Sequence, residues 1–126
     1  MLDLNDRSPR NILKPAQFLV ENVNLLPKGQ VLDVAMGTGV NAVYLARMGF
    51  EVEGVDISAE AVNAALELAR KSGVNLKARL ADLESNYRIR KSSYNVIICF
   101  KYLQRSLIQQ MKDGLRTGGM VVYETF

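Results

Sequence analysis

The stretch Val31–Gly39, VLDVAMGTG, most constrains what this chain can fold into. Its first half is a short apolar run typical of a buried strand, and its glycines predict a tight loop that leads into a helix from Val40 onward. Such a unit leaves backbone N–H groups and a helix N-terminus facing open space, where a ligand can approach. Asp33 stands out because an unpaired carboxylate is costly to bury. We expect it at the emerging end of the strand, next to a partner such as a ligand cation.

Composition narrows the class of protein. With 126 residues, 48% of them apolar, the chain has the size of one globular domain. Its net charge of +3 comes from scattered basic residues without interleaved aromatic ones, which disfavours nucleic-acid binding. The lack of histidine argues against zinc or serine-triad chemistry and against a metal site. One cysteine, no signal peptide and no apolar run long enough to span a membrane predict a cytoplasmic protein.

Hydrophobic periodicity predicts an alternation of strands and helices. After Pro15, apolar residues at helical spacing predict a first helix that ends at Pro27–Gly29. The expected strands are 30–35, 51–56, 76–80, 94–100 and 120–125, and the expected helices between them are 41–48, 59–71 and 107–115. Ser58 is the expected N-cap of the helix 59–71, and Gly73 is expected to follow its last turn. The segment 81–93 is expected to be a polar loop.

This alternation predicts an α/β fold of the Rossmann-like, doubly wound type, with a mainly parallel sheet and helices on both faces. Residues 1–29 are expected to form an N-terminal arm and helix, and residues 30–126 the ligand-binding part of a single domain. In such folds, ligands bind beyond the carboxyl ends of the strands, where the strand order reverses. Loops expected at that edge carry Asp33, Asp56 and Asp82.

These loops together resemble those of the class I S-adenosylmethionine-dependent methyltransferases, and the resemblance extends over residues 31–126. The acidic-x-Gly-x-Gly-x-Gly loop of that family is matched by Asp33, Gly37 and Gly39, with Ala35 at its first glycine position. We expect alanine to be accommodated there with a negative φ. The sequence around these motifs looks most like the small-molecule methyltransferases of the tellurite-resistance type.

The resemblance implies S-adenosyl-L-methionine as cofactor and gives each loop a role. Asp56 is expected to accept hydrogen bonds from the ribose hydroxyls, and Ile57 to stack on the adenine. Asp82 is expected to receive the adenine amino group, and the Leu83 N–H group to meet the ring. The glycine-rich loop is expected to lie against the methionyl part, with Asp33 near its ammonium group.

The implied reaction is methyl transfer from the sulfonium to a small nucleophilic acceptor. Because this in-line displacement has a good leaving group, it needs alignment and desolvation rather than a strong base. The lack of histidine is then no obstacle. Tyr102 and Arg105 follow the fourth expected strand and are the candidates for orienting the acceptor.

Other interpretations remain open from the residues alone. Asp56 can simply begin the helix capped by Ser58, and Asp82 can cap a short turn. The segment GTGVNA, which starts at Gly37, also satisfies the G-x-G-x-x-G/A pattern of NAD-binding domains. Asp33 argues against NAD because a carboxylate repels a pyrophosphate. A non-catalytic nucleoside-binding module of the same fold is a third alternative.

Two features outside these motifs are expected to be structural. Cys99 lies in the most continuous apolar run and has no histidine to activate it, so we expect a buried core thiol. Arg88, Arg90 and Lys91 are the nearest approach to a basic patch, and we expect them on a solvated loop.

The C-terminal end also carries an expectation. The resembling family continues past its fifth strand with another helix and two more strands, so this chain looks short and is expected to lack the last two strands. The fifth strand then exposes apolar residues along an unpaired edge, which a folded protein avoids. This predicts a homodimer through the last strand and weak catalysis.

Overall fold

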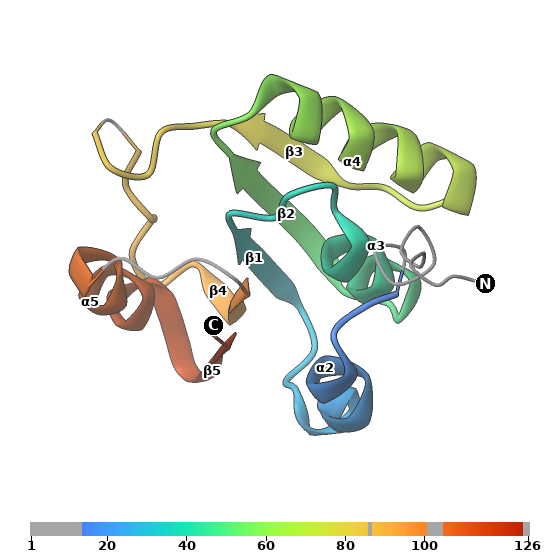
Figure 1. Ribbon diagram of the computed structural model, residues 1–126. Helices are drawn as coiled ribbons and strands as arrows, with labels where there is room; N and C mark the ends of the chain where they lie inside the picture. Colours follow the sequence, from blue (N-terminus) through green and yellow to red (C-terminus); the bar gives the residue numbers. More distant parts are fainter. Residues whose placement is uncertain (1–13, 86, 101–104, 125–126) are drawn as a thin grey trace.

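A five-stranded parallel sheet forms the centre of the computed structural model, which describes residues 14–85, 87–100 and 105–124 (Figure 1). The strands are β1 (Gln30–Val34), β2 (Glu51–Asp56), β3 (Lys77–Leu80), β4 (Tyr94–Phe100) and β5 (Leu115–Glu124). Their order across the sheet is β3-β2-β1-β4-β5, and each neighbouring pair is parallel. The order reverses between β1 and β4, where doubly wound folds bind their ligands. The predicted fold class is confirmed.

Helices lie on both faces of this sheet (Figure 1). They are α2 (Gln17–Asn22) with the 3-10 turn η1 (Val23–Leu25), α3 (Val40–Arg47), α4 (Ala59–Ser72) and α5 (Arg105–Gly114). Leu19 of α2 and Leu45 of α3 join one core cluster with Val31 and Ile98 of the sheet. Leu107 of α5 packs in the opposite cluster. The sheet is therefore covered by α2 and α3 on one face and by α5 on the other.

The ends of α4 follow from local sequence. Its N-cap Ser58 accepts a hydrogen bond from Ala61 N at 3.1 Å through Oγ. Its C-cap Gly73 has a φ of 71°, the left-handed conformation that glycine adopts without strain. The cap and the stop predicted for this helix are confirmed, and its buried residues are Val62, Ala65 and Ala69.

The largest departure from the predicted element bounds is in β5. This strand begins at Leu115 rather than at 120, and the helix before it ends at Gly114. Leu115 pairs with Tyr94, and after a register shift Met120 pairs with Val96. Gly118, expected to precede the strand, has a φ of 83° inside it. Gly118 and Gly119 therefore form an irregularity within β5 rather than a separate turn before it.

The structure also tests the predictions made for Cys99, for the segment 81–93 and for the last strand. Cys99 is buried in the core, as predicted. The segment 81–93 is not uniformly polar, because Leu83 and Ile89 are buried against the sheet. The last strand β5 forms one edge of the sheet, with Met120 and Tyr123 exposed. Among the described residues, no helix is long and apolar enough to cross a membrane.

Candidate functional site

Two backbone hydrogen bonds hold three loops together at the carboxyl ends of the central strands. Met36 N, in the loop after β1, donates to Val55 O of β2 at 2.9 Å. Ala81 N, directly after β3, donates to Asp56 O at 2.9 Å. The loops that follow β1, β2 and β3 therefore meet at one edge of the sheet, as the strand order predicts.

Asp56 shapes two of these loops with its side chain. Its Oδ2 atom accepts a hydrogen bond from Gly37 N at 2.8 Å, and Oδ1 accepts one from Ser58 N at 2.9 Å. The carboxylate therefore helps to begin the α4 turn, as one of the alternatives proposed. Each carboxylate oxygen has a further lone pair, so Asp56 can also accept hydrogen bonds from a ligand.

Asp33 is more deeply buried than its sequence position suggested. It lies within β1, paired in register with Gly54 and Ile98, and is only 2% exposed. Its Oδ2 atom has no hydrogen-bond partner among the described residues. Burial, and then the charge of Asp56, raise the pKa of the Asp33 carboxyl well above its ordinary value. The partner expected for Asp33 is therefore not one of the described side chains.

The backbone conformation expected for Ala35, in the glycine-rich motif, needs a correction. The expected negative φ is wrong, because Ala35 has a φ of 60°. The next residue, Met36, donates its N–H to Val55 O, and this bond holds the chain in the tight turn that directly follows β1. A residue with a Cβ pays a strain energy in this conformation, whereas the glycine of the family pattern does not.

Gly37 and Gly39 are both left-handed, with φ of 60° and 85°, but their surroundings differ. A Cβ added at Gly37 meets no atom within 4 Å, so this residue faces open space. A Cβ added at Gly39 lies 2.6 Å from the Cβ of Ala65 in α4. Gly39 is therefore needed for packing α3 against α4, while Gly37 leaves room for a ligand.

The remaining predicted cofactor residues lie around the ends of β2 and β3. Ile57 follows Asp56 and is 67% exposed, so its apolar side chain is available to a flat ring. Asp82 follows Ala81 and accepts a hydrogen bond from Glu84 N at 2.9 Å through Oδ1. That bond, and a second one with Ser85, lower the pKa of the Asp82 carboxyl.

Asp82 thus caps a short turn, as its alternative interpretation expected. Leu83, the next residue, is buried in the core cluster that also contains Val55 of β2. Only one of the two residues predicted to orient the acceptor lies within the part of the chain that the structure describes. Arg105 is exposed at the first residue of α5, and Tyr102 lies outside the described residues.

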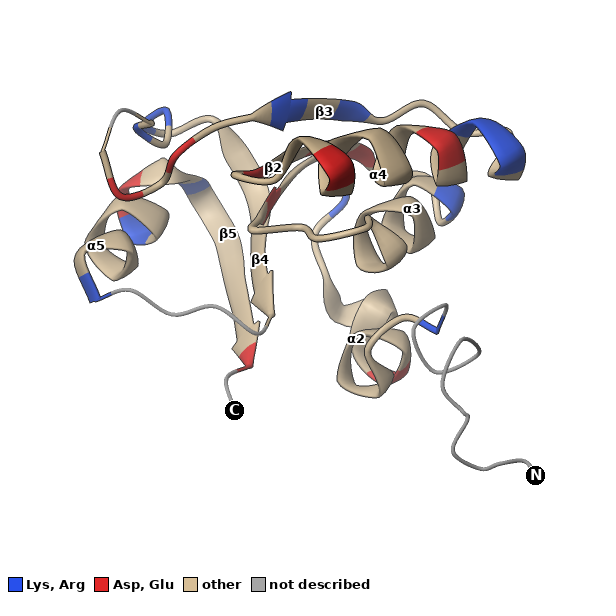
Figure 2. Cartoon of the chain, turned by 45° about the horizontal axis from the view of Figure 1, so that its top comes forward, with Lys and Arg blue, Asp and Glu red and all other residues tan. Residues whose placement is uncertain are grey.

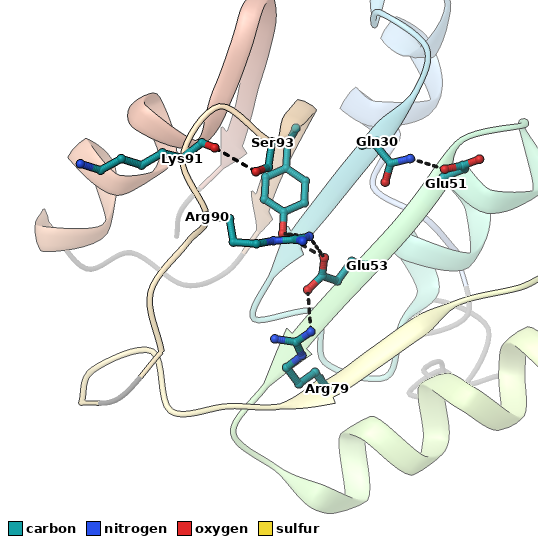
Figure 3. Close-up of polar contacts among 8 residues, drawn as sticks. Gln30, Glu51, Glu53, Arg79, Arg90, Lys91 and Ser93 are labelled. Carbon is teal, nitrogen blue, oxygen red and sulfur yellow. Dashed lines mark hydrogen bonds and ion pairs between the residues drawn. The ribbon is translucent and has the colours of Figure 1, made fainter.

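Sequence reasoning missed a polar cluster on the sheet (Figure 3). Arg90, expected to be solvated, donates from Nη2 to Glu53 Oε1 at 3.0 Å and to Tyr94 OH at 3.1 Å. Arg88, Arg90 and Lys91 are all exposed, as predicted, but Arg90 also pairs with a buried carboxylate, which the sequence did not indicate. The available signal was Glu53 itself, a charged residue inside an apolar strand.

Met36 is a second residue that sequence reasoning missed. Its side chain packs directly on Gly54 of β2, where an added Cβ would collide with Sδ. It also joins Val62 and Ala65 of α4 in a small core cluster. This contact fixes the glycine-rich loop against β2 and α4. A glycine inside a strand was the available signal, since it often marks a close approach.

Comparisons with known proteins agree with this geometry. Residues 31–119 match the family described as "Methyltransferase domain". Ubiquinone biosynthesis O-methyltransferase of Colwellia psychrerythraea is 25% identical over 137 residues, covering 95% of this chain and 56% of the relative. Ribosomal RNA small subunit methyltransferase C of Alcanivorax borkumensis is 42% identical over 66 residues, covering 52% of this chain and 20% of the relative.

The solved structure of TehB from Haemophilus influenzae shares the fold, with a TM-score of 0.74 and 22% identity over 94% of this chain and 41% of that one. The chain thus spans only about half, or less, of the length of these proteins. The match of residues 31–119 nevertheless covers most of the chain and includes all three loops of the site. This chain therefore belongs to the methyltransferase domain family.

Proposed function

We propose that the chain binds S-adenosylmethionine at the carboxyl edge of its sheet and transfers the methyl group to a small nucleophilic acceptor. The observation that carries this proposal is the open space at Gly37, a residue hydrogen-bonded to Asp56, whose charge also acts on buried Asp33. Two carboxylates beside an open loop suit a ligand that carries positive charge and hydroxyl donors. S-adenosylmethionine has an ammonium, a sulfonium and a ribose diol.

The proposed contacts follow the order of the loops. The segment from Ala35 to Gly39 lies against the methionyl part, with Asp33 near the ammonium. Asp56 accepts hydrogen bonds from the ribose hydroxyls with the lone pairs that Gly37 and Ser58 leave free. The exposed side chain of Ile57 stacks on the adenine. Asp82 and the N–H group of Leu83 meet the edge of the ring.

Methyl transfer from a sulfonium requires no strong acid or base among the residues of the chain. When bound, the sulfonium supplies an activated methyl group and leaves as a neutral thioether after in-line attack by the acceptor. The residues of the chain then have to align the two reactants and exclude water. We propose Tyr102 and Arg105 as the residues that orient the acceptor.

A small molecule is the acceptor class that we favour over a nucleic acid. The ubiquinone-pathway relative aligns with 95% of this chain, whereas the ribosomal RNA methyltransferase aligns with 52%. Figure 2 shows the basic residues spread over several elements, including β3 and the end of α4. A nucleic-acid backbone instead favours basic residues gathered on one face.

Two alternatives lead to different results in binding experiments. NAD would place its anionic pyrophosphate beside the glycine-rich loop, where Asp33 and Asp56 already repel one another. A nucleoside-binding module without catalysis would bind the cofactor but transfer no methyl group. We favour catalysis because the family to which the chain belongs is one of methyltransferases.

Three further parts of the proposal concern the whole chain. We propose residues 30–126 as the cofactor-binding domain and residues 1–29 as its appended arm and helix, and the family match over 31–119 supports that division. We propose a homodimer through β5, since this edge strand exposes Met120 and Tyr123. We also propose a cytoplasmic location, since the sequence contains a single cysteine and therefore no internal disulfide.

Isothermal titration calorimetry with S-adenosylmethionine, S-adenosylhomocysteine and NAD tests the proposal. We expect micromolar to submillimolar affinity for the first two, and an affinity for NAD at least about tenfold weaker. Tighter binding of NAD would overturn the assignment. A screen for methyl transfer to thiols, amines and chalcogen oxyanions, read by mass spectrometry, then separates an enzyme from a binding module.

A further inference from the structure

Glu53 is a carboxylate in the middle of β2 that is only 8% exposed. Its Oε1 atom accepts hydrogen bonds from Tyr94 OH at 2.9 Å and from Arg90 Nη2 at 3.0 Å. Its Oε2 atom lies 3.6 Å from Arg79 Nη2. Figure 3 shows the carboxylate held between the two guanidinium groups. One side chain of β2 therefore connects β3, β4 and the segment that precedes β4.

Stability alone is a poor explanation for this cluster. The side chains of Arg79 and Arg90 are 61% and 66% exposed, and solvent-exposed ion pairs contribute little. An apolar residue at position 53 would avoid the desolvation that a buried carboxylate pays. What the carboxylate adds is a fixed geometry, because hydrogen bonds to Tyr94 and Arg90 are directional and apolar contacts are not.

The cluster is connected to the turn that carries Asp82. Tyr87 N donates to Asp82 O at 3.1 Å and closes this turn. Tyr87 packs against the core cluster that contains Tyr94. Burial, and then the nearby Tyr94 phenol and Glu53 carboxylate, raise the pKa of Tyr87 above its ordinary value. Arg90 attaches the chain to Glu53 three residues further on. The segment that leaves the turn is therefore joined to the cluster, through Tyr87 beside Tyr94 and through Arg90 on Glu53.

We infer that Glu53 and Tyr94 are positioning residues that hold the Asp82–Tyr87 turn in place for selective recognition of a 6-aminopurine nucleoside. This inference rests on the proposed function, in which Asp82 receives the adenine amino group. A 6-oxopurine presents an acceptor oxygen at the same position and leaves a correctly placed carboxylate without a donor. Selectivity then depends on how firmly the turn is held.

The test compares S-adenosylhomocysteine with S-inosylhomocysteine, in which oxygen replaces the adenine amino group. We expect the wild-type chain to prefer the adenine compound by about tenfold or more. Glu53→Gln and Tyr94→Phe are expected to reduce this preference to less than about threefold, because the turn is no longer fixed. Glu51→Gln, an exposed position on the same strand, is the matched control and is expected to keep the preference.

Amide hydrogen exchange of the ligand-free chain gives a second readout. We expect Glu53→Gln to speed exchange at Glu84 and Tyr87 by about tenfold, and Glu51→Gln to leave it unchanged. If Glu53→Gln does not fold, Tyr94→Phe, which loses only a hydroxyl group, serves in both experiments.

An unchanged preference in folded variants would overturn the selectivity role, and unchanged exchange would overturn the anchor. Equal loss of affinity for both compounds would show general damage to the site and contradict the inference. Absence of S-adenosylhomocysteine binding by the wild-type chain would overturn the proposed function and the selectivity together. The exchange result would still decide whether Glu53 holds the turn.

Discussion

Gly37 and Asp56 are joined by a hydrogen bond of 2.8 Å from the backbone N–H group of the glycine to Oδ2 of the carboxylate. This bond connects the loop after β1 to the end of β2. The other oxygen of Asp56 accepts from Ser58 N at the start of α4. One carboxylate therefore shapes two loops of the proposed cofactor site, and its loss is expected to affect folding and binding together.

Asp56→Ala removes both backbone hydrogen bonds and the proposed ribose contact. We expect S-adenosylhomocysteine to bind about tenfold more weakly or worse, and the free energy of unfolding to fall by about 1–3 kcal/mol. Calorimetry and urea unfolding measure the two effects. Glu60→Ala, which removes a neighbouring acidic residue from the first turn of α4, is the control and should change little. Reduced stability with unchanged affinity would leave Asp56 only its structural role.

Ala35→Gly is expected to stabilise the chain. Ala35 has a φ of 60°, a conformation that costs an L-residue about 1–2 kcal/mol, and part of the gain is offset by the greater backbone freedom of glycine when unfolded. We therefore expect a net gain of about 0.5–1 kcal/mol in urea unfolding. Ala64→Gly, inside α4, should instead destabilise by about 1 kcal/mol. A loss at both positions would contradict the strain at Ala35.

Local signals in the sequence were sufficient for most of the fold. Ser58 and Gly73 mark the ends of α4 because caps depend on adjacent residues only. The continuous apolar run of β4 likewise predicts a central parallel strand. The environment of Glu53 could not be predicted, because Arg90 and Tyr94 lie 37 and 41 residues away along the chain.

The site was predictable in its residues but less so in its geometry. The strand order brings together the carboxyl-terminal ends of β1, with Asp33, and β2, with Asp56, and the loop after β3, with Asp82. The positive φ of Ala35 was missed, since it is associated with a hydrogen bond between the following residue and another strand. The depth of Asp33 was also missed, because burial in mid-sheet depends on the helices that cover it.

Asp33 is expected to make stability depend on pH. Burial, and secondly the charge of Asp56, raise the pKa of its carboxyl well above the ordinary value. The folded chain therefore holds this proton more tightly than the unfolded chain does. The resulting contribution to stability is fully present below the unfolded pKa of about 3.9 and is lost as the pH rises through the folded pKa.

Asp33→Asn removes this titration. We expect the variant to be more stable than the wild-type chain at pH 7, with the difference shrinking toward pH 4 (urea unfolding at several pH values), and to bind S-adenosylmethionine more weakly. For Asp82 we expect the opposite dependence of stability on pH, which Asp82→Asn would remove, because hydrogen bonds lower the pKa of the Asp82 carboxyl. Its contribution is present above the unfolded pKa and is lost as the pH falls through the folded one. Equal pH profiles for Asp33→Asn and the wild-type chain would be evidence against the raised pKa.

The edge strand β5 predicts association of the chain. Met120 and Tyr123 are exposed on it, and unpaired edges with apolar residues promote pairing between chains. We expect light scattering to show a dimer at tens of micromolar and the double substitution Met120→Lys with Tyr123→Lys to yield monomers. Phe18→Lys, at an exposed apolar position on α2, is the control and should leave the dimer intact. A wild-type monomer at these concentrations would refute the prediction.

Gly37→Ala and Gly39→Ala are expected to separate binding from folding. Both residues have positive φ, so each substitution brings a backbone strain of about 1 kcal/mol or more. At Gly39 the new Cβ also lies 2.6 Å from the Cβ of Ala65, and the total loss of stability should reach about 2–4 kcal/mol. At Gly37 the Cβ meets no atom of the chain within 4 Å and instead enters the space assigned to the cofactor.

Gly37→Ala should therefore stay folded and bind S-adenosylhomocysteine at least about tenfold more weakly, while Gly39→Ala should lose stability first. Urea unfolding and calorimetry on the same preparations distinguish the two effects. Undiminished affinity in a folded Gly37→Ala variant would mean that the open space beside this residue is not where the cofactor lies, and the proposed site would have to be moved.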